Sequence, residues 1–440
     1  MKKVITYGTF DLLHYGHINL LKRAKKLGDY LIVGVTADDF DKRRGKINVE
    51  QSSIERVEAV RALGIADEII IEEYEGQKID DIKKFDVDIF AIGSDWVGQF
   101  DYLQKYCQVV YLARTEGVSS SEIREDKRML KMGVVGDSVS INKIVKECDY
   151  VNGIHVEAIC TTSVEISEDN VDNIKFITSD YKKMLQEVDA VYIRSVPSEH
   201  YEQVRYALEN NKHVICEAPL AVRKEQCEAL FELADANGCV LMEGIKTAYS
   251  TAYWRLLLLA NSGKIGRVTC IDATCTSLRI KDNGWSSLYE WGPTAMLPVF
   301  QLLGTDYISK SIVMRMDNDD ITYDTFSKID FTYDNAVASL KLGNEVKSES
   351  ELVIAGTKGY IYVPAPWWKT DYFEIRYENA SDNKRYFYQL DGEGIRYELV
   401  AFVKAIQGDK NTSKIDREIT YITSQILQDA AEGNDVRIIN

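Results

Sequence analysis

Two histidines, His14 and His17, stand close together in the segment YGTFDLLHYGH (7–17). The segment follows a strand-like apolar run and precedes a helical pattern, so both imidazoles are expected where a helix begins. Exposed backbone N–H groups and the helix dipole favour an anion there, and Gly8 and Gly16 allow close approach of the backbone. Paired imidazoles can donate to phosphate oxygens as negative charge develops at phosphorus. The segment predicts phosphoryl chemistry; two histidines capping a core turn are the alternative.

A second segment, residues 114–123, reads RTEGVSSSEI. The guanidinium of Arg114 and a turn glycine precede Ser and Thr residues that can cap a helix, with Glu122 near its third position. Considered alone, the segment is equally well explained as a capping box. Together with the histidine segment, it predicts the other half of a triphosphate cradle.

A glycine turn also follows a strand pattern at residues 132–138, MGVVGDS. This is a partial dinucleotide fingerprint, because Ser138 and Ile141 stand where the second and third glycines are expected. The acid that would hold an adenosine ribose is missing, since the next strand ends in Cys160-Thr161-Thr162.

The elements that must position these segments alternate between strands and helices over roughly the first 250 residues, which is typical of parallel α/β sheets. Strands are predicted at Lys3–Tyr7, Tyr30–Val35, Glu68–Ile71, Ile89–Ile92, Gln108–Ala113, Met132–Val135, His155–Thr161, Ala190–Val196, His213–Glu217 and Val240–Glu243. Helices are predicted at His17–Lys26, Ser53–Leu63, Ile141–Glu147, Tyr201–Asn210 and Lys224–Asn237.

After about Gly266 the pattern changes to two-fold alternation, which predicts a mainly antiparallel sheet. Its strands include Phe326–Tyr333, Ala336–Leu342 and Leu352–Val363, and helices at Tyr397–Ile406 and Ile419–Ala431 end the series. We therefore predict three domains, residues 1–127, 131–250 and 251–440.

Composition limits the function classes. The 440 residues carry a net charge of −16, which argues against non-specific binding to nucleic acid or an anionic membrane but leaves anionic small ligands open. No apolar run approaches the roughly 20 residues of a membrane span, and Trp254–Ala260 is expected in a buried helix. The start shows no signal-peptide pattern, and the eight cysteines show no metal-ligand spacing. We expect a cytoplasmic protein with reduced core thiols and no resident metal.

The first 125 or so residues resemble the glycerol-3-phosphate cytidylyltransferase family of the HxGH nucleotidyltransferases. The matching motifs are GTFDLLHYGH (8–17), GSDWVGQFDYL (93–103) and RTEGVSSSEI (114–123). Sequences of the RTEGIS type mark cytidylyltransferases as opposed to their adenylyl-transferring relatives, although an adenylyltransferase stays a further alternative. The resemblance implies in-line attack by a substrate phosphate oxygen on CTP, with release of pyrophosphate.

By this resemblance, the catalytic residues are His14, His17, Lys46 and Arg114, which would stabilise charge at the phosphates. Lys46 as a solvated loop charge is the alternative for that residue. The nucleotide would be bound by Gly8, Thr9, Phe10, Gly16, Asp95, Trp96, Thr115, Ser119 and Ser120, and Mg²⁺ is expected with the CTP. In one departure, Gly64 replaces an arginine that the family usually carries eight residues after Arg56; Arg61 could substitute for it.

From about residue 131 the chain resembles the Gfo/Idh/MocA oxidoreductase family. The motifs are VPSEH (196–200), HVICEAPLA (213–221), LME (241–243) and GEGIRYE (392–398). The resemblance implies an α/β chain in which the HxGH domain is fused to a Rossmann dinucleotide-binding domain and an antiparallel α/β domain. It also implies NAD(P) as cofactor and a homo-oligomer. The cofactor would be bound by Gly133, Gly136, Ser138, Thr161, Pro197, Glu217 and Pro219.

The catalytic lysine of that family is replaced by Ala218, so Lys246 is the candidate for a substitute acid, whereas His200 and His213 are expected to be structural. The hypothesis is a bifunctional enzyme for teichoic acid or capsule synthesis. It makes a CDP-polyol from CTP and a polyol phosphate, and its reductase module makes that polyol phosphate. In the alternative, the reductase-like module is catalytically degenerate and serves oligomerisation or ligand sensing.

Overall fold

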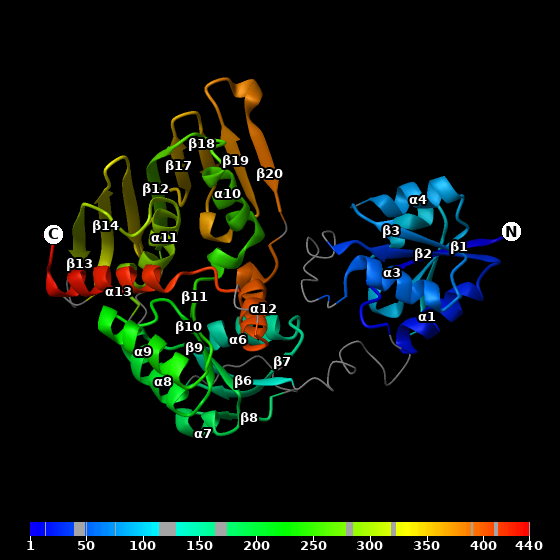
Figure 1. Ribbon diagram of the computed structural model, residues 1–440, viewed down its shortest axis with the longest axis horizontal. Helices are drawn as coiled ribbons and strands as arrows, with labels where there is room; N and C mark the ends of the chain where they lie inside the picture. The colour runs from blue at the N-terminus through cyan, green and yellow to red at the C-terminus, as the bar shows by residue number, and fades with distance from the viewer. Residues whose placement is uncertain are drawn as a thin grey trace. The chain divides into compact units, whose positions relative to one another are not determined.

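The computed structural model describes residues 1–13, 15–38, 49, 51–74, 76–113, 129–162, 174–278, 285–317, 323–388, 390–408 and 412–439. These residues divide into two compact units, Met1–Met129 and Leu130–Asn440 (Figure 1). Each unit is described by itself. The predicted boundary between residues 250 and 251 lies inside the second unit and stays a prediction.

The first unit is a parallel sheet with the strand order β3-β2-β1-β4-β5. Alternate strand residues face opposite sides: Val4 packs with α1 and α3, whereas its neighbour Ile5 packs with α4. The predicted strands are confirmed as β1 (Lys3–Gly8), β2 (Tyr30–Thr36), β3 (Glu68–Glu72), β4 (Ile89–Gly93) and β5 (Gln108–Leu112). The helices are α1 (Tyr15–Lys25), α3 (Ser53–Ala62) and α4 (Gln77–Phe85), the last of which the sequence analysis missed.

The order of these strands reverses between β1 and β4. From β1 the chain builds outward through β2 and β3, and then returns to place β4 on the other side of β1. The carboxyl ends of β1 and β4 therefore lie side by side, and in open α/β sheets ligands bind at such a point. The loops that leave these two ends carry the first two motifs of the unit.

The second unit begins with another parallel sheet, in the order β11-β10-β9-β6-β7-β8. Here the order reverses between β6 and β9, so their carboxyl ends form the equivalent point. The strands are β6 (Leu130–Gly136), β7 (Ile154–Cys160), β8 (Phe176–Thr178), β9 (Ala190–Arg194), β10 (His213–Glu217) and β11 (Leu241–Gly244). The helices are α6 (Ser138–Cys148), α7 (Tyr181–Leu185), α8 (Pro197–Glu209) and α9 (Lys224–Ala236).

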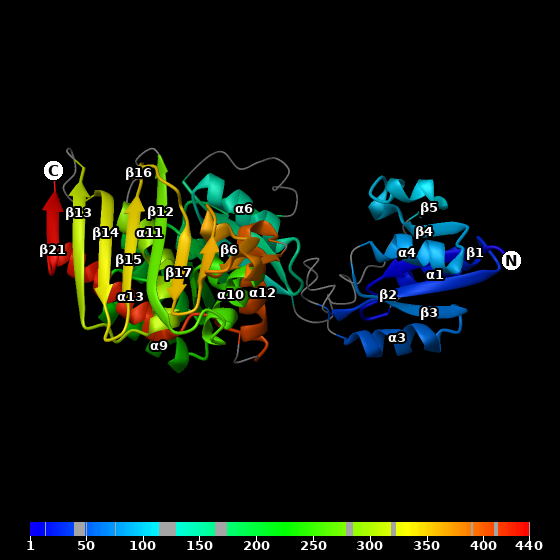
Figure 2. The same cartoon turned by 90° about the horizontal axis from the view of Figure 1, so that it is seen from above.

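The rest of the second unit is a large sheet in the order β20-β19-β18-β17-β12-β15-β14-β13-β21, with β16 paired to β12 (Figure 2). The prediction of a mainly antiparallel sheet is confirmed, although β12–β15 and β13–β21 are parallel neighbours. The strands are β12 (Val268–Leu278), β13 (Ser309–Met316), β14 (Asp324–Thr332), β15 (Val337–Gly343), β16 (Glu345–Val346), β17 (Leu352–Gly356), β18 (Tyr360–Val363), β19 (Tyr372–Arg376), β20 (Lys384–Phe387) and β21 (Val436–Ile439).

Two predictions for this part were wrong. The single strand predicted at 352–363 is two strands, β17 and β18, which pair with each other across a tight turn. Gly359 in that turn lies so close to the next strand that a Cβ would be 2.6 Å from the carbonyl oxygen of Arg376. The helix at 254–260 is amphipathic and not fully buried, since Trp254 is 39% and Leu258 45% exposed.

Helices cover one face of the large sheet and join it to the parallel sheet. Helix α11 packs on β12, β14 and β15, and α13 packs on both α11 and α9, so α13 bridges the two sheets. The helices are α10 (Thr251–Asn261), α11 (Ser287–Leu303), α12 (Ile395–Ile406) and α13 (Arg417–Glu432). Short 3₁₀ turns lie at η4 (Lys246–Tyr249), η5 (Trp367–Lys369) and η7 (Gly392–Gly394).

All eight cysteines are free. Five of them are buried, as expected for core thiols: Cys148, Cys160, Cys216, Cys227 and Cys275. Among the described residues, no helix combines the length and apolar character needed to cross a membrane. The same part of the chain contains no cluster of three or more His, Cys, Asp or Glu side chains suited to a metal ion.

Candidate functional site

The loop that leaves β1 has an unusual backbone. Phe10 and Leu12 adopt positive φ angles of 54° and 46°, a region that bulky residues enter only when the surroundings enforce it. Phe10 is 1% exposed, and a Cβ on Gly8 would lie 2.9 Å from its ring. The strained loop is thus built around a buried phenyl ring, which requires a glycine at position 8.

The guanidinium of Arg56 holds this loop in place. Fully buried on α3, it donates hydrogen bonds to the carbonyl oxygens of Thr9 at 2.7 Å, Thr36 at 2.9 Å and Gln51 at 3.0 Å. It also pairs with the Asp38 carboxylate at 2.6 Å. One side chain therefore joins the ends of β1 and β2 to the start of α3.

The start of α3 contacts the loop a second time. The backbone N–H of Leu12 donates to Gln51 Oε1 at 2.9 Å, and the N–H of Gln51 donates to Asp11 Oδ1 at 3.0 Å. Ser52 and Glu55 then form a reciprocal capping box. The sequence analysis gave no role to Asp11, Gln51 or Arg56. The capping pattern Ser52-x-x-Glu55, directly after Gln51, was the signal that could have located the start of the helix.

The described residues of the first two motifs follow the carboxyl ends of β1 and β4. Gly16 and His17 lie in the first turn of α1, and the His17 ring stands edge-on to Phe10 with centroids 5.5 Å apart. Trp96 lies in η1 (Ser94–Trp96), directly after β4, with its ring 5.9 Å from that of Phe100. His14, Lys46, Arg114, Thr115, Ser119, Ser120 and the side chain of Asp95 lie outside the described residues.

Arg61, the suggested replacement for the missing arginine, forms an ion pair on its own helix. Arg61 is 59% exposed and pairs with Glu58 on the same helix. Gly64 has a φ of +62° and ends the helix as a turn residue. In the described conformation, the guanidinium of Arg61 is thus engaged on the outer face of α3.

In the second unit, Arg194 occupies the point where the strand order reverses. It ends β9, and its guanidinium lies 2.8 Å from Asp137, 2.9 Å from Glu217 and 4.0 Å from Glu290. The face of the guanidinium lies over Trp285, 5.0 Å from the ring centroid. Burial opposes the charge, but the three carboxylates raise the pKa of Arg194 above its ordinary value.

These residues alter the place where a dinucleotide pyrophosphate ordinarily binds. Such a pyrophosphate binds the N–H groups at the start of the helix that follows the glycine turn. Here the Asp137 carboxylate caps that helix and accepts from the N–H and hydroxyl of Ser140, both at 2.9 Å. A second anion at this place would be repelled, and the cation nearby is already paired.

The other predicted cofactor residues lie as follows. Gly136 needs its positive φ and its lack of a side chain, because a Cβ would be 2.8 Å from the Arg194 carbonyl oxygen. Gly133 lies inside β6 against Met184, which makes it a packing glycine. The backbone N–H of Thr161 bonds to Thr178 at 2.9 Å. Pro197 begins α8, and the side chain of Ser138 lies outside the described residues.

The Ala218–Pro219 peptide bond is cis. The imidazole of His200 is fully buried, with one nitrogen 2.8 Å from the Pro219 carbonyl oxygen and the other 2.9 Å from that of Ser195. His200 therefore joins the loops after β9 and β10, consistent with a structural role.

A buried acid to which the sequence analysis gave no role lies near Glu217. Glu398 is fully buried, and burial raises its pKa well above the usual range. The Tyr192 hydroxyl lies 3.4 Å from Glu398 and 3.3 Å from Glu217. Lys246, the predicted substitute acid, instead donates to Glu393 at 3.0 Å. Glu398 is the last residue of the motif GEGIRYE (392–398), which was the signal for it, although nothing local marks a helix glutamate as buried.

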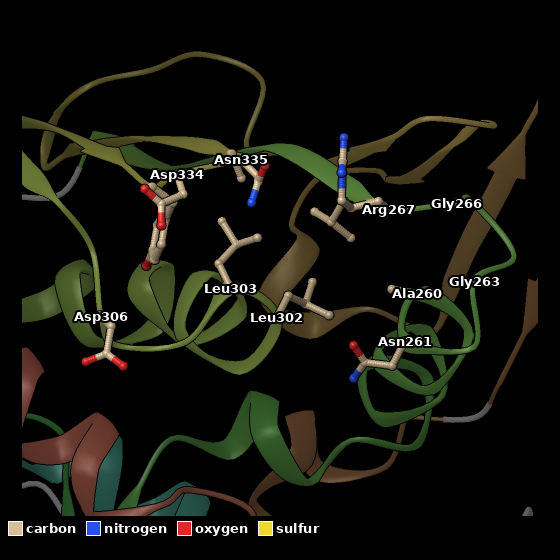
Figure 3. A pocket seen from close by; sticks show the side chains of 13 residues that line it. Ala260, Asn261, Gly263, Gly266, Arg267, Leu302, Leu303, Asp306, Asp334 and Asn335 are labelled. Atoms are coloured by element: carbon tan, nitrogen blue, oxygen red, sulfur yellow. The ribbon is translucent and has the colours of Figure 1, made fainter.

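A cavity of about 450 Å³ opens elsewhere in the second unit (Figure 3). Its lining includes Asn261 at the end of α10, Leu303 at the end of α11 and Arg267 before β12. None of the sequence-predicted site residues lines it.

Comparison with known proteins agrees with this division. Residues 5–126 match the family model Cytidylyltransferase-like, and residues 130–245 match the model of the Oxidoreductase family, NAD-binding Rossmann fold. The glycerol-3-phosphate cytidylyltransferase of Bacillus spizizenii is 51% identical over 130 residues, which are 30% of this chain and all of that protein. The enzyme of the same name from Staphylococcus aureus is 48% identical over 126 residues, 29% of this chain and 95% of that protein.

Solved structures resemble the rest of the chain in fold. A 3-ketoreductase from Actinomadura kijaniata, crystallised with NADP and TDP-benzene, is 19% identical with a TM-score of 0.61 and covers 70% of this chain and 98% of its own. An NAD-binding oxidoreductase from Klebsiella pneumoniae is 16% identical with a TM-score of 0.57. The match covers 70% of this chain and 96% of that protein. Both predicted family resemblances are thereby confirmed, the second at the level of fold.

Replacing Arg56 tests the anchoring of the loop. Arg56→Ala should lower the free energy of unfolding by about 2–4 kcal/mol, because buried carbonyl oxygens lose their donors. The free energy of unfolding of Arg56→Lys should lie between those of wild type and Arg56→Ala, because an ammonium group cannot reproduce the planar array of donors of a guanidinium. Urea titration measures the effect, and Arg61→Ala on the exposed side of α3 is the control, expected within about 0.5 kcal/mol of wild type. Equal stability of the two alanine variants would contradict the anchoring role.

The Asp38–Arg56 pair should make stability depend on pH. Partial burial opposes charge on Asp38, but hydrogen bonds from Ser53 and Arg56 outweigh it and lower the pKa of Asp38 below the ordinary 3.8. The charged pair therefore stabilises the fold above that value, and the contribution is lost as the pH falls through the folded pKa. Acid titration of wild type and Asp38→Asn should show a shallower decline in the variant. Parallel curves would exclude the coupling.

Proposed function

The chain belongs, through its N-terminal unit, to the glycerol-3-phosphate cytidylyltransferase family, and we propose that this unit transfers CMP from CTP to a polyol phosphate. The observation that carries the proposal is that two of the family's motifs follow the carboxyl ends of the neighbouring strands β1 and β4. The loop after β1 and the turn after β4 flank the point where the strand order reverses. Glycerol 3-phosphate, the acceptor named for the relatives, defines the substrate class.

The reaction is a displacement at phosphorus. A phosphate oxygen of the polyol phosphate attacks the α-phosphorus of CTP and forms a new P–O bond. The bond from the α-phosphorus to the oxygen bridging to the β-phosphorus breaks, and its electron pair leaves with pyrophosphate. Such a transfer depends on positioning and charge stabilisation more than on covalent catalysis.

The residues of this unit divide those tasks. His17, oriented by the buried Phe10 ring, donates to the phosphate oxygens where charge develops, and His14 provides the second donor. Lys46 and Arg114 neutralise the triphosphate. Backbone groups of the loop at Gly8 and Thr9 contact the nucleotide, and their position depends on the hydrogen bond from Arg56 to Thr9.

Mg²⁺ enters with CTP. Of the described carboxylates near the loop, Asp11 accepts from Gln51 and Asp38 pairs with Arg56. The cation would therefore be held by the triphosphate oxygens, where it neutralises charge. The CDP-polyol product suits a donor of polyol phosphate units for a cell-surface polymer such as teichoic acid or capsule.

For the C-terminal unit, the site favours ligand binding over hydride transfer. The fold is that of NAD-binding oxidoreductases, but Ala218 replaces the family's lysine and Asp137 occupies the phosphate position at the start of α6. Arg194 is fully engaged by carboxylates of its own chain. A reductase that supplies the polyol phosphate is the competing function, and assembly into a homo-oligomer stays a prediction.

Replacing His17 tests the transferase. His17→Ala should lower kcat by on the order of 10²–10³, measured as pyrophosphate release from CTP with glycerol 3-phosphate. His155→Ala is a matched control, because that histidine lies on β7 of the other unit and is 36% exposed. Unchanged turnover in His17→Ala would refute its role, and faster turnover with ATP than with CTP would overturn the choice of nucleotide.

Cofactor titration tests the C-terminal unit. The full chain should show no change in tryptophan or nicotinamide fluorescence with millimolar NADH or NADPH. Asp137→Ser should bind more tightly than wild type, because serine still caps the helix but removes the competing charge. Tight binding to wild type, with oxidation of NADPH by a keto-polyol phosphate, would establish the reductase instead.

A further inference from the structure

Three lysines of the C-terminal unit surround one carboxylate. Lys369 Nζ lies 2.7 Å and Lys143 Nζ 3.6 Å from Glu393 Oε1, and Lys246 Nζ lies 3.0 Å from Glu393 Oε2. Counted together with Arg396 and its two carboxylate partners, Glu147 and Asp391, the three lysines and Glu393 leave a local excess of one positive charge in a chain whose net charge is −16. The neighbouring Arg396 is paired with its own carboxylates.

The four residues come from separate elements that fix one another. Lys143 is on α6, Lys246 on η4, Lys369 on η5 and Glu393 on η7. The buried Thr247 hydroxyl donates to the Trp368 carbonyl oxygen at 2.9 Å and joins η4 to η5. The three lysine side chains remain 52%, 29% and 32% exposed, so a ligand from solvent can reach them.

The backbone is strained to place the carboxylate there. Glu393 has φ 55° and ψ 17°, in the left-handed region, which is unfavourable for a residue other than glycine. It lies between Gly392 and Gly394, where side chains would meet Glu147 and the Lys246 carbonyl oxygen. Burial raises the pKa of Glu393, but Lys369 and Lys246 outweigh burial and hold this pKa at about 2. Burial and the neighbouring lysines lower the pKa of Lys369.

A buried acid lies next to this cluster. The charge of Lys246 acts on Glu398, and among the described residues no hydrogen-bond partner lies on Glu398 Oε1. That oxygen would be 2.8 Å from a Cβ on Gly244, so it faces the end of β11. A protonated carboxyl group at this place can donate a hydrogen bond to a hydroxyl or carbonyl oxygen.

We propose that the three lysines bind the phosphate of a phosphate monoester, with Glu393 as the internal anion that balances them in the free protein. A phosphate monoester carries a charge of about −1.5 to −2 at pH 7, which is opposite in sign to the local excess. The proposal rests on the ligand-binding role of this unit, and names its ligand class.

Binding of inorganic phosphate and glycerol 3-phosphate to the full chain tests the site. Calorimetry at low ionic strength, where screening is weak, would compare wild type, Lys369→Ala, Lys143→Ala, Glu393→Gln and Lys328→Ala. Each cluster lysine variant should weaken binding to this site by roughly tenfold. Glu393→Gln should tighten it, because the competing carboxylate is gone. Lys328, paired with Asp330 on β14 and 43% exposed, is the control and should bind as wild type.

The direction of the Glu393→Gln effect separates binding from a structural role. A purely structural ion cluster predicts lower thermal stability in every cluster variant and no gain in phosphate affinity. Lys143 is the most exposed of the three lysines, so its variant provides the test if Lys369→Ala does not fold. Equal phosphate binding in all folded variants, or none in wild type, would overturn the proposal. Pyrophosphate release from CTP, measured on the same wild-type sample, reports separately on the transferase.

Discussion

The buried guanidinium of Arg56 is the interaction on which the nucleotidyltransferase site depends. A strained loop with two bulky residues at positive φ cannot hold its shape alone, because the left-handed backbone is costly. Arg56 satisfies three carbonyl oxygens and pairs with Asp38. Only a planar group with several donors can do this at one place. The geometry of His17 and of the loop backbone follows from that anchor.

The second unit also has an arginine at this point of its sheet, but its partners are of a different kind. Arg194 also stands where the strand order reverses, but three carboxylates and an indole ring surround it. In the first unit the cation shapes a loop and leaves the anion site open. In the second unit the ion pairs of Arg194 lie at the carboxyl end of β9, where the strand order reverses. Three lysines of this unit, in contrast, share the single carboxylate of Glu393.

Much of the fold could be predicted because apolar runs in parallel strands are continuous and end in recognisable turns. Helix α11 was missed, and it contains Pro293 and Pro298, residues that ordinarily argue against a helix. The strand predicted at 352–363 failed because an exposed turn there keeps the two-fold alternation of the strands on either side. The roles of Asp11 and Gln51 depend on contacts between distant segments, which no local pattern records.

The sequence by itself determined the class of chemistry at the first site. Histidines, glycines and a following helix are adjacent in the chain, and the motifs at 8–17, 93–103 and 114–123 carry a family resemblance. Only the tertiary structure decided how charge is distributed between the sites. Whether Arg194 or Lys246 is available to a ligand depends on carboxylates that lie far away in the sequence, such as Glu290 and Glu393. Charged groups pair over a few ångströms in space. The separation of two residues along the sequence does not show whether the fold brings them that close.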